Sequence, residues 1–375
     1  MLLVLLSILV WLGLISFWGG FWKADQRLGG LEPPAEWPSV TAIIPARDEA
    51  AQIVEILEAH AASAYPGPFR VVLVDDGSTD GTGDMARRVK GPIQVVEAPP
   101  IASGWTGKLW ALHHGIAAAK EGEAEYLLLT DADILHAPDT LSHLVAKAEQ
   151  GRALVSLMAR LDARVVWGAL LIPAFVFFFQ KLYPFSWVND PARRTAAAAG
   201  GCVLIRREVL EEIGGVQSLR GALIDDCTLA ASVKRAGHPV WLGLARDEVI
   251  SLRDNRALGS VWTMVARTAF TQLRHSPLLL LGSTLGMALL YLTAPLALVA
   301  GLTMLDGTLA FYGMLGWTLI AGAYRPTARL YGQPLWQSLT LPAAAVLYMA
   351  MTLDSARRHW LNRGGAWKGR VYPAG

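Results

Sequence analysis

The sequence has few charged residues and almost no cysteine. Of its 375 residues, 17% are charged, against about 25% in average soluble domains, and the formal net charge is +2. A net charge this small gives no basis for a nucleic-acid partner. Cys202 and Cys227 are the only cysteines and lack metal-type spacing, so we interpret them as buried free thiols, consistent with a reducing cytoplasm. Internal repeats and low-complexity tracts are also absent, and the length allows one large domain or two medium ones.

Hydrophobic residues, in contrast, make up 53% of the chain and gather in long uncharged runs near both ends. The first run, residues 2–22, has 21 residues, about the number that a membrane-spanning helix needs. No basic segment precedes it and no small-x-small cleavage site follows it, so a retained anchor fits better than a cleaved signal peptide. Lys23 and Arg27 come directly after it and predict that this end faces the cytoplasm. Residues 1–31 are therefore expected to be a transmembrane anchor with its juxtamembrane segment.

Three further apolar runs, residues 278–302, 308–324 and 335–353, are uncharged and close to spanning length. They predict a C-terminal transmembrane region over residues 276–356. The basic segment 324–334 favours a cytoplasmic connection, yet three crossings would place the basic tail, residues 357–375, outside. The number of spans and the side of the C-terminus therefore stay open. The chain is predicted to be a multi-pass protein of the inner membrane with its central domain in the cytoplasm.

The central domain, residues 40–275, follows a proline-rich linker and alternates short apolar runs with amphipathic stretches. Continuous apolar runs are typical of strands buried on both faces, and strand–helix alternation predicts an α/β domain with a mostly parallel sheet. We expect strands over residues 40–46, 70–78, 93–99 and 124–134, and helices over 49–62, 78–89 and 109–120. Ligands of such sheets bind at the carboxyl ends of the strands.

Polar residues follow these strands where a ligand would bind. Asp75 and Asp76 end one strand, where a carboxylate can accept a nucleobase N–H or hold a ribose hydroxyl; helix capping is a sufficient explanation for the neighbouring Ser78, Thr79 and Asp80. Lys108 stands at a helix start, a favourable place for phosphate, although a solvated lysine would look the same. Asp131 and Asp133 follow the strand YLLLT, and such hard oxygen ligands suit Mg²⁺ or Mn²⁺ bridged to phosphates. Helix capping is the alternative for these two aspartates.

The second half of the domain adds two clusters. Gly200 and Gly201 would let the backbone pass close to a ligand, with tight packing as the alternative. Asp225 and Asp226 precede an amphipathic helix, where we expect Asp225 to be the N-cap. A carboxylate facing the metal site could instead take a proton from an acceptor hydroxyl.

Six successive motifs resemble the signatures of family 2 glycosyltransferases: IIPARDEA, VLVDDGSTDGT, GWTGKLWAL, LLLTDADI, GGCVLIRR and IDDCTLAASVKRAGH. The resemblance covers about residues 40–275. It implies the Rossmann-like GT-A fold, a nucleotide-sugar donor, expected to be a UDP-sugar, and transfer with inversion. Together with the terminal AWKGRVY, the layout is most similar to the hopanoid-associated membrane glycosyltransferases and to ceramide glucosyltransferase-like enzymes. The domain would comprise a nucleotide-sugar half (40–155), an interfacial segment (165–188) and an acceptor half (190–275).

The resemblance also implies roles for individual residues. Asp131 and Asp133 would hold the divalent metal and the diphosphate, and Asp226 would be the general base, with Asp225 in place of the family's glutamate. The nucleotide sugar would be bound by Pro45, Arg47, Glu49, Asp75, Asp76, Lys108 and Asp131. On the side of the acceptor and the diphosphate would lie Gly200, Gly201, Arg206 and Arg274. The segment TQLRH departs from the Gln-x-x-Arg-Trp of processive members, which argues against a polysaccharide synthase.

The acceptor is suggested by residues 165–179, an aromatic run too short to span a membrane and interrupted by Pro173. We favour an interfacial segment that touches lipid over a core helix. The expected acceptor is then a membrane lipid alcohol such as a hopanoid. One alternative is a polyprenyl-phosphate sugar transferase, which would need basic groups such as Arg206, Arg207 and Arg274 near Asp226. Another is a membrane scaffold with a degenerate domain, which predicts lost acids at the strand ends.

Overall fold

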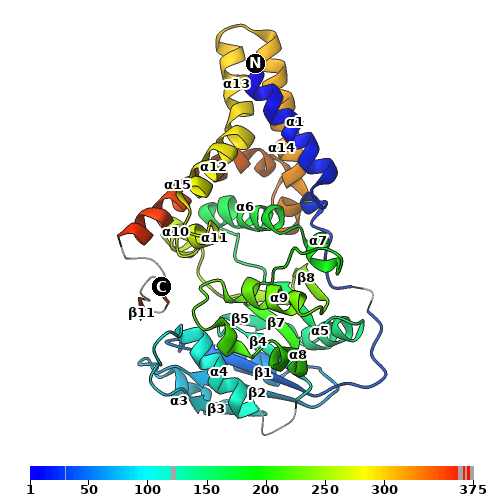
Figure 1. Ribbon diagram of the computed structural model, residues 1–375, viewed down its shortest axis with the longest axis vertical. Helices are drawn as coiled ribbons and strands as arrows, with labels where there is room; N and C mark the ends of the chain where they lie inside the picture. Colours follow the sequence, from blue (N-terminus) through cyan, green and yellow to red (C-terminus); the bar gives the residue numbers. More distant parts are fainter. Residues whose placement is uncertain (30, 120–123, 362–365, 368–369, 372–375) are drawn as a thin grey trace.

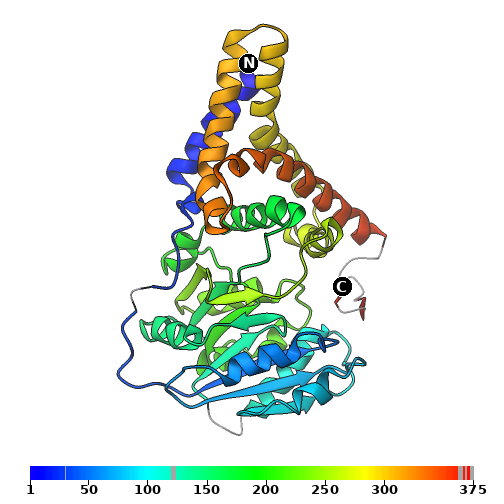
Figure 2. The same ribbon diagram turned by 180° about the vertical axis from the view of Figure 1, so that it is seen from behind.

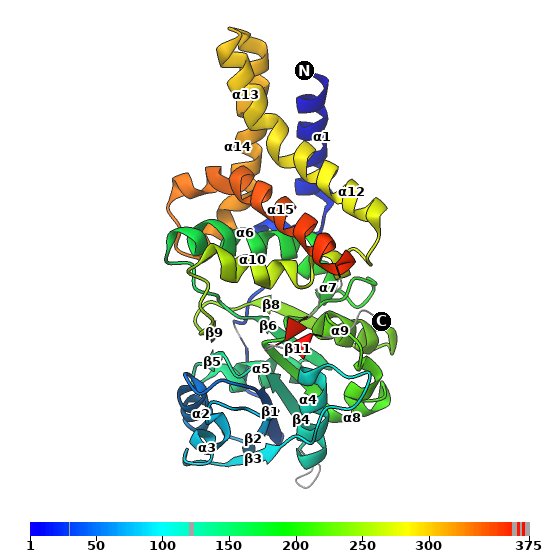
Figure 3. The same ribbon diagram turned by 90° about the vertical axis from the view of Figure 1, so that its left-hand side faces the viewer.

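The computed structural model describes residues 1–29, 31–119, 124–361, 366–367 and 370–371. An α/β domain lies at one end of the molecule, a stalk of helices at the other, and a layer of crossing helices between them (Figures 1, 2 and 3). The stalk contains α1 (Leu2–Phe17), α13 (Thr293–Thr303) and α14 (Gly307–Leu330). The intervening layer contains α6 (Val166–Leu182), α10 (Leu258–Ala266) and α15 (Leu341–Trp360).

The α/β domain is built on a sheet of seven strands in the order β3-β2-β1-β4-β7-β6-β8. Their bounds are β1 (Val40–Ala46), β2 (Phe69–Asp75), β3 (Ile93–Glu97), β4 (Tyr126–Thr130), β6 (Leu154–Met158), β7 (Cys202–Arg206) and β8 (Val240–Leu244). Only β7 runs antiparallel to its neighbours, β4 and β6. A small antiparallel sheet pairs β5 (Ile134–His136) with β9 (Val249–Ser251). The prediction of an α/β domain with a mostly parallel sheet is confirmed.

Alternate residues of the strands pack into two cores on opposite faces of the sheet. Ile43 of β1 and Leu129 of β4 belong to the core that contains α4 (Gly107–Ala119). Their neighbours Ile44 and Leu128 belong to the core that contains α2 (Ile53–Ala61) and α5 (Thr140–Glu149). Every residue of β1 and β4 is buried. Coverage on both faces explains why these strands are continuous apolar runs.

Helix α2 begins at Ile53, later than the Glu49 expected from the sequence. The backbone N–H of Glu49 donates to Thr82 Oγ1 at 2.8 Å, and that of Ala50 donates to Asp80 Oδ2 at 2.9 Å. Residues 49–52 therefore form a turn that is tied to the start of α3 (Thr82–Ala86). Shorter elements complete the chain: η1 (Phe21–Lys23), α7 (Phe185–Asn189), α8 (Arg207–Glu212), η3 (Val216–Leu219), α9 (Asp225–Arg235) and α11 (Ala269–Gln272).

Two helices of the described chain are long and apolar enough to cross a membrane: Pro277–Thr303 and Leu335–Trp360. The first joins α12 (Pro277–Met287), the π-helical η4 (Ala288–Leu292) and α13, and the second joins the 3₁₀ turn η5 (Leu335–Thr340) to α15. They correspond to the first and third C-terminal runs. The middle run lies in α14, which is not one of the two. Helix α14 continues through Pro326 to Leu330, so the first half of the basic segment 324–334 is helical.

The predicted N-terminal span over residues 2–22 is not a single helix. Helix α1 ends at Phe17, and its 16 residues extend about 24 Å at 1.5 Å per residue, less than a hydrocarbon core of about 30 Å. Gly19 and Gly20 have φ of 59° and 58°, a left-handed conformation that ends the helix. Trp11, near the middle of α1, is fully buried against Phe177 and Tyr291 and is a packing residue.

Helix α6 contains the aromatic run that was expected to break at Pro173. The helix continues through Pro173 to Leu182, so that expectation is wrong. Pro173 and the side chains around it are buried, and α6 lies against α10, α14 and α15. Exposed apolar side chains remain at its two ends, at Val166 and Leu182. The interfacial role of this segment stays a prediction.

The C-terminal tail is described only in part. Strands β10 (Ala366–Trp367) and β11 (Arg370–Val371) pair with each other within the AWKGRVY motif. The rest of residues 362–375 lies outside the described chain.

Candidate active site

One narrow cavity at an edge of the sheet brings together residues from both halves of the domain. Its lining includes Pro45, Lys108, Asp131, Gly200, Asp225 and Asp226. Pro45 lies in β1, and Asp131 directly follows β4. Gly200 precedes β7, whose amino end meets the carboxyl end of β4 because the two strands are antiparallel. Three of the predicted donor residues, Pro45, Lys108 and Asp131, therefore face the same space as the predicted base.

The lysine at the start of α4 connects the two groups of acids. Lys108 Nζ lies 2.8 Å from Asp131 Oδ1 and 3.5 Å from Asp225 Oδ2. Burial by itself lowers the pKa of Lys108, but the neighbouring carboxylates outweigh burial and raise this pKa above its ordinary value. Lys108 therefore stays charged and supplies the positive charge at the centre of the cavity.

The second aspartate of the Asp-x-Asp pair has its own counter-ion. Asp133 Oδ2 accepts from Arg253, whose Nε lies at 3.1 Å and whose Nη2 lies at 3.0 Å. The Asp133 side chain is 8% exposed. Its burial raises the pKa of Asp133, and Arg253 acts against that rise. Asp131 and Asp133 are thus each held by a basic side chain.

The base candidate, Asp226, is held by backbone donors. Its Oδ2 accepts from the N–H of Gly200 at 2.8 Å, and its Oδ1 accepts from its neighbour Cys227 at 2.7 Å. Burial and the adjacent Asp225 raise the pKa of Asp226 to about 6. A carboxylate with a pKa near 6 is charged at neutral pH and is a better proton acceptor than an ordinary aspartate.

The expectation that Asp225 caps the following helix is wrong. Helix α9 begins at Asp225, its N-cap is Ile224, and no side chain caps it. Asp225 is the first helical residue and turns toward Lys108 instead. Both aspartates are thus used within the cavity, and the positive end of the helix dipole favours their charge.

The predicted nucleotide residues lie at the ends of β1 and β2. The Arg47 guanidinium donates to the backbone carbonyl of Asp76, and its Nη1 lies 4.0 Å from Asp76 Oδ2. Asp76 is 2% exposed. Asp75 Oδ1 accepts from the N–H of Ser78 at 2.9 Å, so this carboxylate holds the turn after β2. Glu49 accepts from Gln52 and belongs to the turn that faces α3.

The turn residues expected to cap α3 do not do so, because the N-cap is Gly81 and no side chain caps the helix; instead they hold the turn and join two loops. Asp80 Oδ1 accepts from the N–H of Thr82 at 3.0 Å at the start of α3. Ser78 Oγ accepts from the N–H of Asp48 at 3.1 Å. The loops after β1 and β2 are therefore fixed to each other beside the cavity.

Two of the arginines named as basic groups near Asp226 lie instead at the opposite edge of the sheet, beside the start of β4. Arg206 ends β7 opposite Tyr126, the first residue of β4, and pairs with Glu149 at 2.9 Å. Arg207 donates to the carbonyl of Ala119, at the end of α4. The placement of Arg206 on the acceptor side is therefore wrong, because β7 runs in the opposite direction to the other central strands.

Other predicted residues have mixed outcomes. Gly201 accepts from Thr130 Oγ1 at 2.8 Å, and a Cβ on Gly201 would come within 3.1 Å of Ile134, so tight packing explains this glycine. Arg274 is exposed in the turn after α11 with φ of 52°, and it is not among the described residues that line the cavity. Cys202 and Cys227 are buried free thiols, as predicted.

Two arginines near the acids were not predicted from the sequence. Arg253 binds Asp133. Arg267 lies at the end of α10, where burial lowers its pKa and the nearby negative charges of Asp131, Asp225 and Asp226 partly offset that fall. In the sequence, Arg253 follows the strand β9 and Arg267 follows the apolar helix α10. No motif and no residue spacing distinguishes either arginine.

The pair Asp131 and Asp133 fits a divalent cation of the hard type. Mg²⁺ and Mn²⁺ commonly use one or two protein carboxylates and take their remaining oxygens from water and a substrate's phosphates. Within the described residues no group of three or more His, Cys, Asp or Glu side chains surrounds a potential metal position. Two carboxylates match this pattern better than an all-protein metal site would.

Comparison with known proteins places the domain in a defined group. A family model described as "Glycosyltransferase like family 2" matches residues 38–275. A probable glycosyltransferase, YdaM of Bacillus subtilis, is 27% identical over 217 residues, which cover 55% of this chain and 49% of that protein. An undecaprenyl-phosphate 4-deoxy-4-formamido-L-arabinose transferase of Shewanella sediminis is 30% identical over 127 residues, 32% of this chain and 36% of that protein. The matches thus span about half or less of these relatives.

A solved structure supports the fold. The mannosyltransferase PcManGT of Pyrobaculum calidifontis, solved in complex with GDP-Man and Mn²⁺, superposes with a TM-score of 0.52. The alignment covers 93% of this chain and 99% of that one, at 20% sequence identity. At this identity the likeness concerns the fold alone.

Proposed function

The chain belongs to the glycosyltransferase-like family 2, and from this premise we propose that it transfers a sugar from a nucleotide-sugar donor to a lipid of the membrane. The observation that carries the proposal is the Lys108 contact with both Asp131 and Asp225. Through Lys108, Asp131 on the diphosphate side is connected to Asp225, which is adjacent to the proposed base. Acids at the strand ends are retained, which speaks against a scaffold with a degenerate domain.

The donor would bind along the edge formed by β1, β2 and β4. The buried Asp76 is suited to the base or ribose, and Lys108 and Arg253 offer positive charge to the diphosphate. A divalent cation, when bound by Asp131 and Asp133, would neutralise the charge that develops on the leaving diphosphate. We propose Mg²⁺ or Mn²⁺ and a UDP-sugar.

Transfer would be a single displacement with inversion. Asp226 takes the proton of the acceptor hydroxyl, and the hydroxyl oxygen forms a bond to the anomeric carbon while the bond from that carbon to the diphosphate breaks. The N–H groups of Gly200 and Cys227 hold the Asp226 carboxylate in one orientation during this step. Asp225 and Lys108 keep the surrounding charge balanced.

The acceptor is proposed to be a lipid because the cavity lies beneath a layer of apolar helices. Helices α6 and α10 separate the α/β domain from the stalk, and two of the described helices have the length and composition of membrane spans (Figures 1 and 3). A lipid alcohol such as a hopanoid could reach Asp226 from this side. In this arrangement the α/β domain faces the cytoplasm, where nucleotide sugars are made.

A polyprenyl-phosphate acceptor is the second candidate. It is favoured by the similarity to undecaprenyl-phosphate transferases, of which two cover 32% of this chain. Arg253 and Arg267, rather than Arg206, would be the basic groups nearest the acids.

The test is to incubate membranes containing the full chain with a panel of radiolabelled nucleotide sugars and then extract the lipids. Labelled lipid that forms with the wild type and not with Asp226→Asn supports the proposal. Mild acid releases sugar from a lipid phosphate but not from a simple lipid glycoside, so acid treatment separates the two acceptor classes. Label that stays only in water-soluble products would reject a lipid acceptor.

A further inference from the structure

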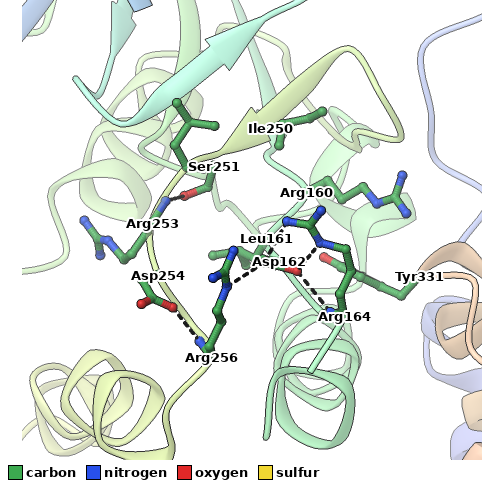
Figure 4. A pocket seen from close by; sticks show the side chains of 12 residues that line it. Arg160, Leu161, Asp162, Arg164, Ile250, Ser251, Arg253, Asp254, Arg256 and Tyr331 are labelled. Atoms are coloured by element: carbon green, nitrogen blue, oxygen red, sulfur yellow. Dashed lines mark hydrogen bonds and ion pairs between the residues drawn. The ribbon is translucent and has the colours of Figure 1, made fainter. Parts of the chain in front are cut away.

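Four arginines line a cavity of about 640 Å³ outside the narrow cavity described above: Arg160, Arg164, Arg253 and Arg256. Its walls come from the segment between β6 and α6, the segment after β9, and Tyr331, which follows α14 (Figure 4). The cavity thus lies where the α/β domain meets the helices expected at the membrane. Arg253 belongs to both places, because it lines this cavity and binds Asp133.

The charges of this cavity are balanced as long as Arg253 binds Asp133. Arg164 makes two hydrogen bonds to Asp162, at 2.9 and 3.0 Å, and Arg256 Nε lies 3.7 Å from the same carboxylate. Arg160 pairs with Asp247 at 2.9 Å, and Asp254 accepts from the backbone N–H of Arg256 at 2.9 Å. The four arginines are therefore matched in number by four nearby aspartates, 133, 162, 247 and 254.

A cation on Asp133 would change this balance. Both nitrogens of Arg253 that reach the buried Asp133 carboxylate contact a single oxygen, Oδ2, so a metal ion bound to this oxygen would take the place of the guanidinium. In Figure 4 Arg164 and Arg256 turn toward Asp162, whereas Arg253 points away from this group. The Arg253 side chain is 42% exposed, so it has room to swing into the cavity once it is released.

We propose that the arginine-lined cavity binds a phosphate group carried by a lipid, and that this phosphate and the metal ion on Asp133 help each other to bind through Arg253. A phosphate monoester carries a charge of about −1.5 to −2 near neutral pH, and guanidinium groups bind it with two parallel hydrogen bonds. Arg256 shares its carboxylate with Arg164 and is 65% exposed, and a released Arg253 adds one positive charge that the cavity no longer balances. A bound phosphate attracts Arg253 away from Asp133 and so favours metal binding there. A metal ion on Asp133 releases Arg253 and so favours phosphate binding, which makes the coupling between the two ligands positive and reciprocal.

A lipid is the favoured source of the phosphate because of where the cavity lies. Arg164 stands two residues before α6 and its side chain is 82% exposed, and Tyr331 comes directly after the last residue of α14. Both helices belong to the apolar part of the structure. A headgroup at this depth would leave its chains beside those helices. The inference goes beyond the transfer reaction, since it can be measured with no nucleotide sugar present.

The experiment measures Mn²⁺ binding to the full chain in dodecyl maltoside micelles by the electron paramagnetic resonance signal of free Mn²⁺. Dodecyl phosphate is the lipid probe, inorganic phosphate is the headgroup without a chain, and a titration without protein gives the Mn²⁺ bound by the probe itself. We expect dodecyl phosphate to lower the apparent Kd for Mn²⁺ about fivefold or more. Inorganic phosphate should do so only at much higher concentration.

Three variants test the route of the coupling. Arg253→Gln should still bind Mn²⁺ but lose its dependence on dodecyl phosphate, and Arg164→Gln should weaken the dodecyl phosphate effect while Mn²⁺ binding without it is unchanged. Arg206→Gln, at the opposite edge of the sheet, is the matched control and should behave as wild type. If inorganic phosphate works as well as dodecyl phosphate, the lipid source is wrong although the phosphate site stands. If neither probe changes Mn²⁺ affinity in the wild type, the proposal is overturned.

Discussion

Replacing each of the two adjacent aspartates of α9 by asparagine should give opposite results. Asp226→Asn removes the proton acceptor of the proposed reaction while it keeps the size of the side chain. A positioned base contributes about 10²–10⁴-fold, so the barrier should rise by about 3–5 kcal/mol at 1.36 kcal/mol per factor of ten. The loss should fall on turnover, and donor affinity should change little.

The contacts of Asp226 predict a stability cost as well. Both of its oxygens accept backbone N–H groups, from Gly200 and Cys227. An asparagine has one oxygen, so its NH₂ group would face one of these donors and leave it unpaired, at a cost of about 1–3 kcal/mol. Asp225→Asn instead weakens a partly exposed ion pair with Lys108 at 3.5 Å, which is worth about 1 kcal/mol or less.

The assay compares turnover at saturating donor, donor affinity and melting temperature for the two variants and wild type. We expect Asp226→Asn to bind donor, to melt a few degrees lower and to be almost inactive, and Asp225→Asn to retain most of its turnover. A dead Asp225→Asn enzyme beside an active Asp226→Asn enzyme would refute the assignment of the base and place it one residue earlier.

Four other predictions follow from the same geometry. Asp131→Asn or Asp133→Asn should lower transfer by orders of magnitude, and EDTA should abolish it; full activity in excess chelator would reject the metal site. Because the pKa of Asp226 is raised to about 6, the base gains its proton as pH falls below 6, and kcat should then fall about tenfold per pH unit; an unchanged rate at pH 5 would contradict this. Gly200→Ala should lower kcat about tenfold, because its Cβ would lie 3.1 Å from Lys108 Nζ and 3.2 Å from Asp226 Oδ2, whereas Gly259→Ala, with nothing within 4 Å, should not. The chain should remain in the membrane fraction after a carbonate wash at pH 11, and its release would argue against the two spans.

The fold of the central domain could largely be predicted from the sequence, because its strands are buried on both faces. Runs such as VTAIIPA and YLLLT have no polar alternation, and strand–helix alternation implies parallel neighbours. The antiparallel direction of β7 could not be predicted, since the run CVLIR is equally apolar in either direction. Direction is decided by the connection from β6 through α6 and α7, which the pattern does not specify.

The antiparallel direction of β7 also explains why Gly200 lies at the cavity and Arg206 does not. If β7 were parallel to β4, Arg206 at its carboxyl end would lie at the site and Gly200 at the far edge. In the antiparallel arrangement Gly200 meets Asp226, and Arg206 pairs with Glu149 at the other edge. The acids at the ends of β2 and β4 were unaffected because those strands are parallel to β1.

Helix ends and counter-ions were the least predictable features. Pro173 and Pro326 both lie inside helices, where buried packing against neighbouring helices overrides the local preference of proline. Arg253 was missed because it follows β9 at a distance of 120 residues from Asp133, and a contact of that range leaves no trace in local spacing.

The internal partners of the acids predict that the proposed metal would serve the reaction and not the fold. Asp131 has Lys108, Asp133 has Arg253, and Asp226 has two backbone N–H donors. A buried carboxylate without a partner would cost several kcal/mol, and such a site would need its metal to fold. Here every one of these carboxylates is already compensated, so a metal bound by Asp131 and Asp133 would exchange one cation for another and would free Lys108 and Arg253 for the phosphates of the proposed donor. Removing metal should therefore stop transfer while the melting temperature of the ligand-free protein stays nearly constant. A large fall of melting temperature in chelator would show that the metal is structural and that the two basic side chains are not its substitutes.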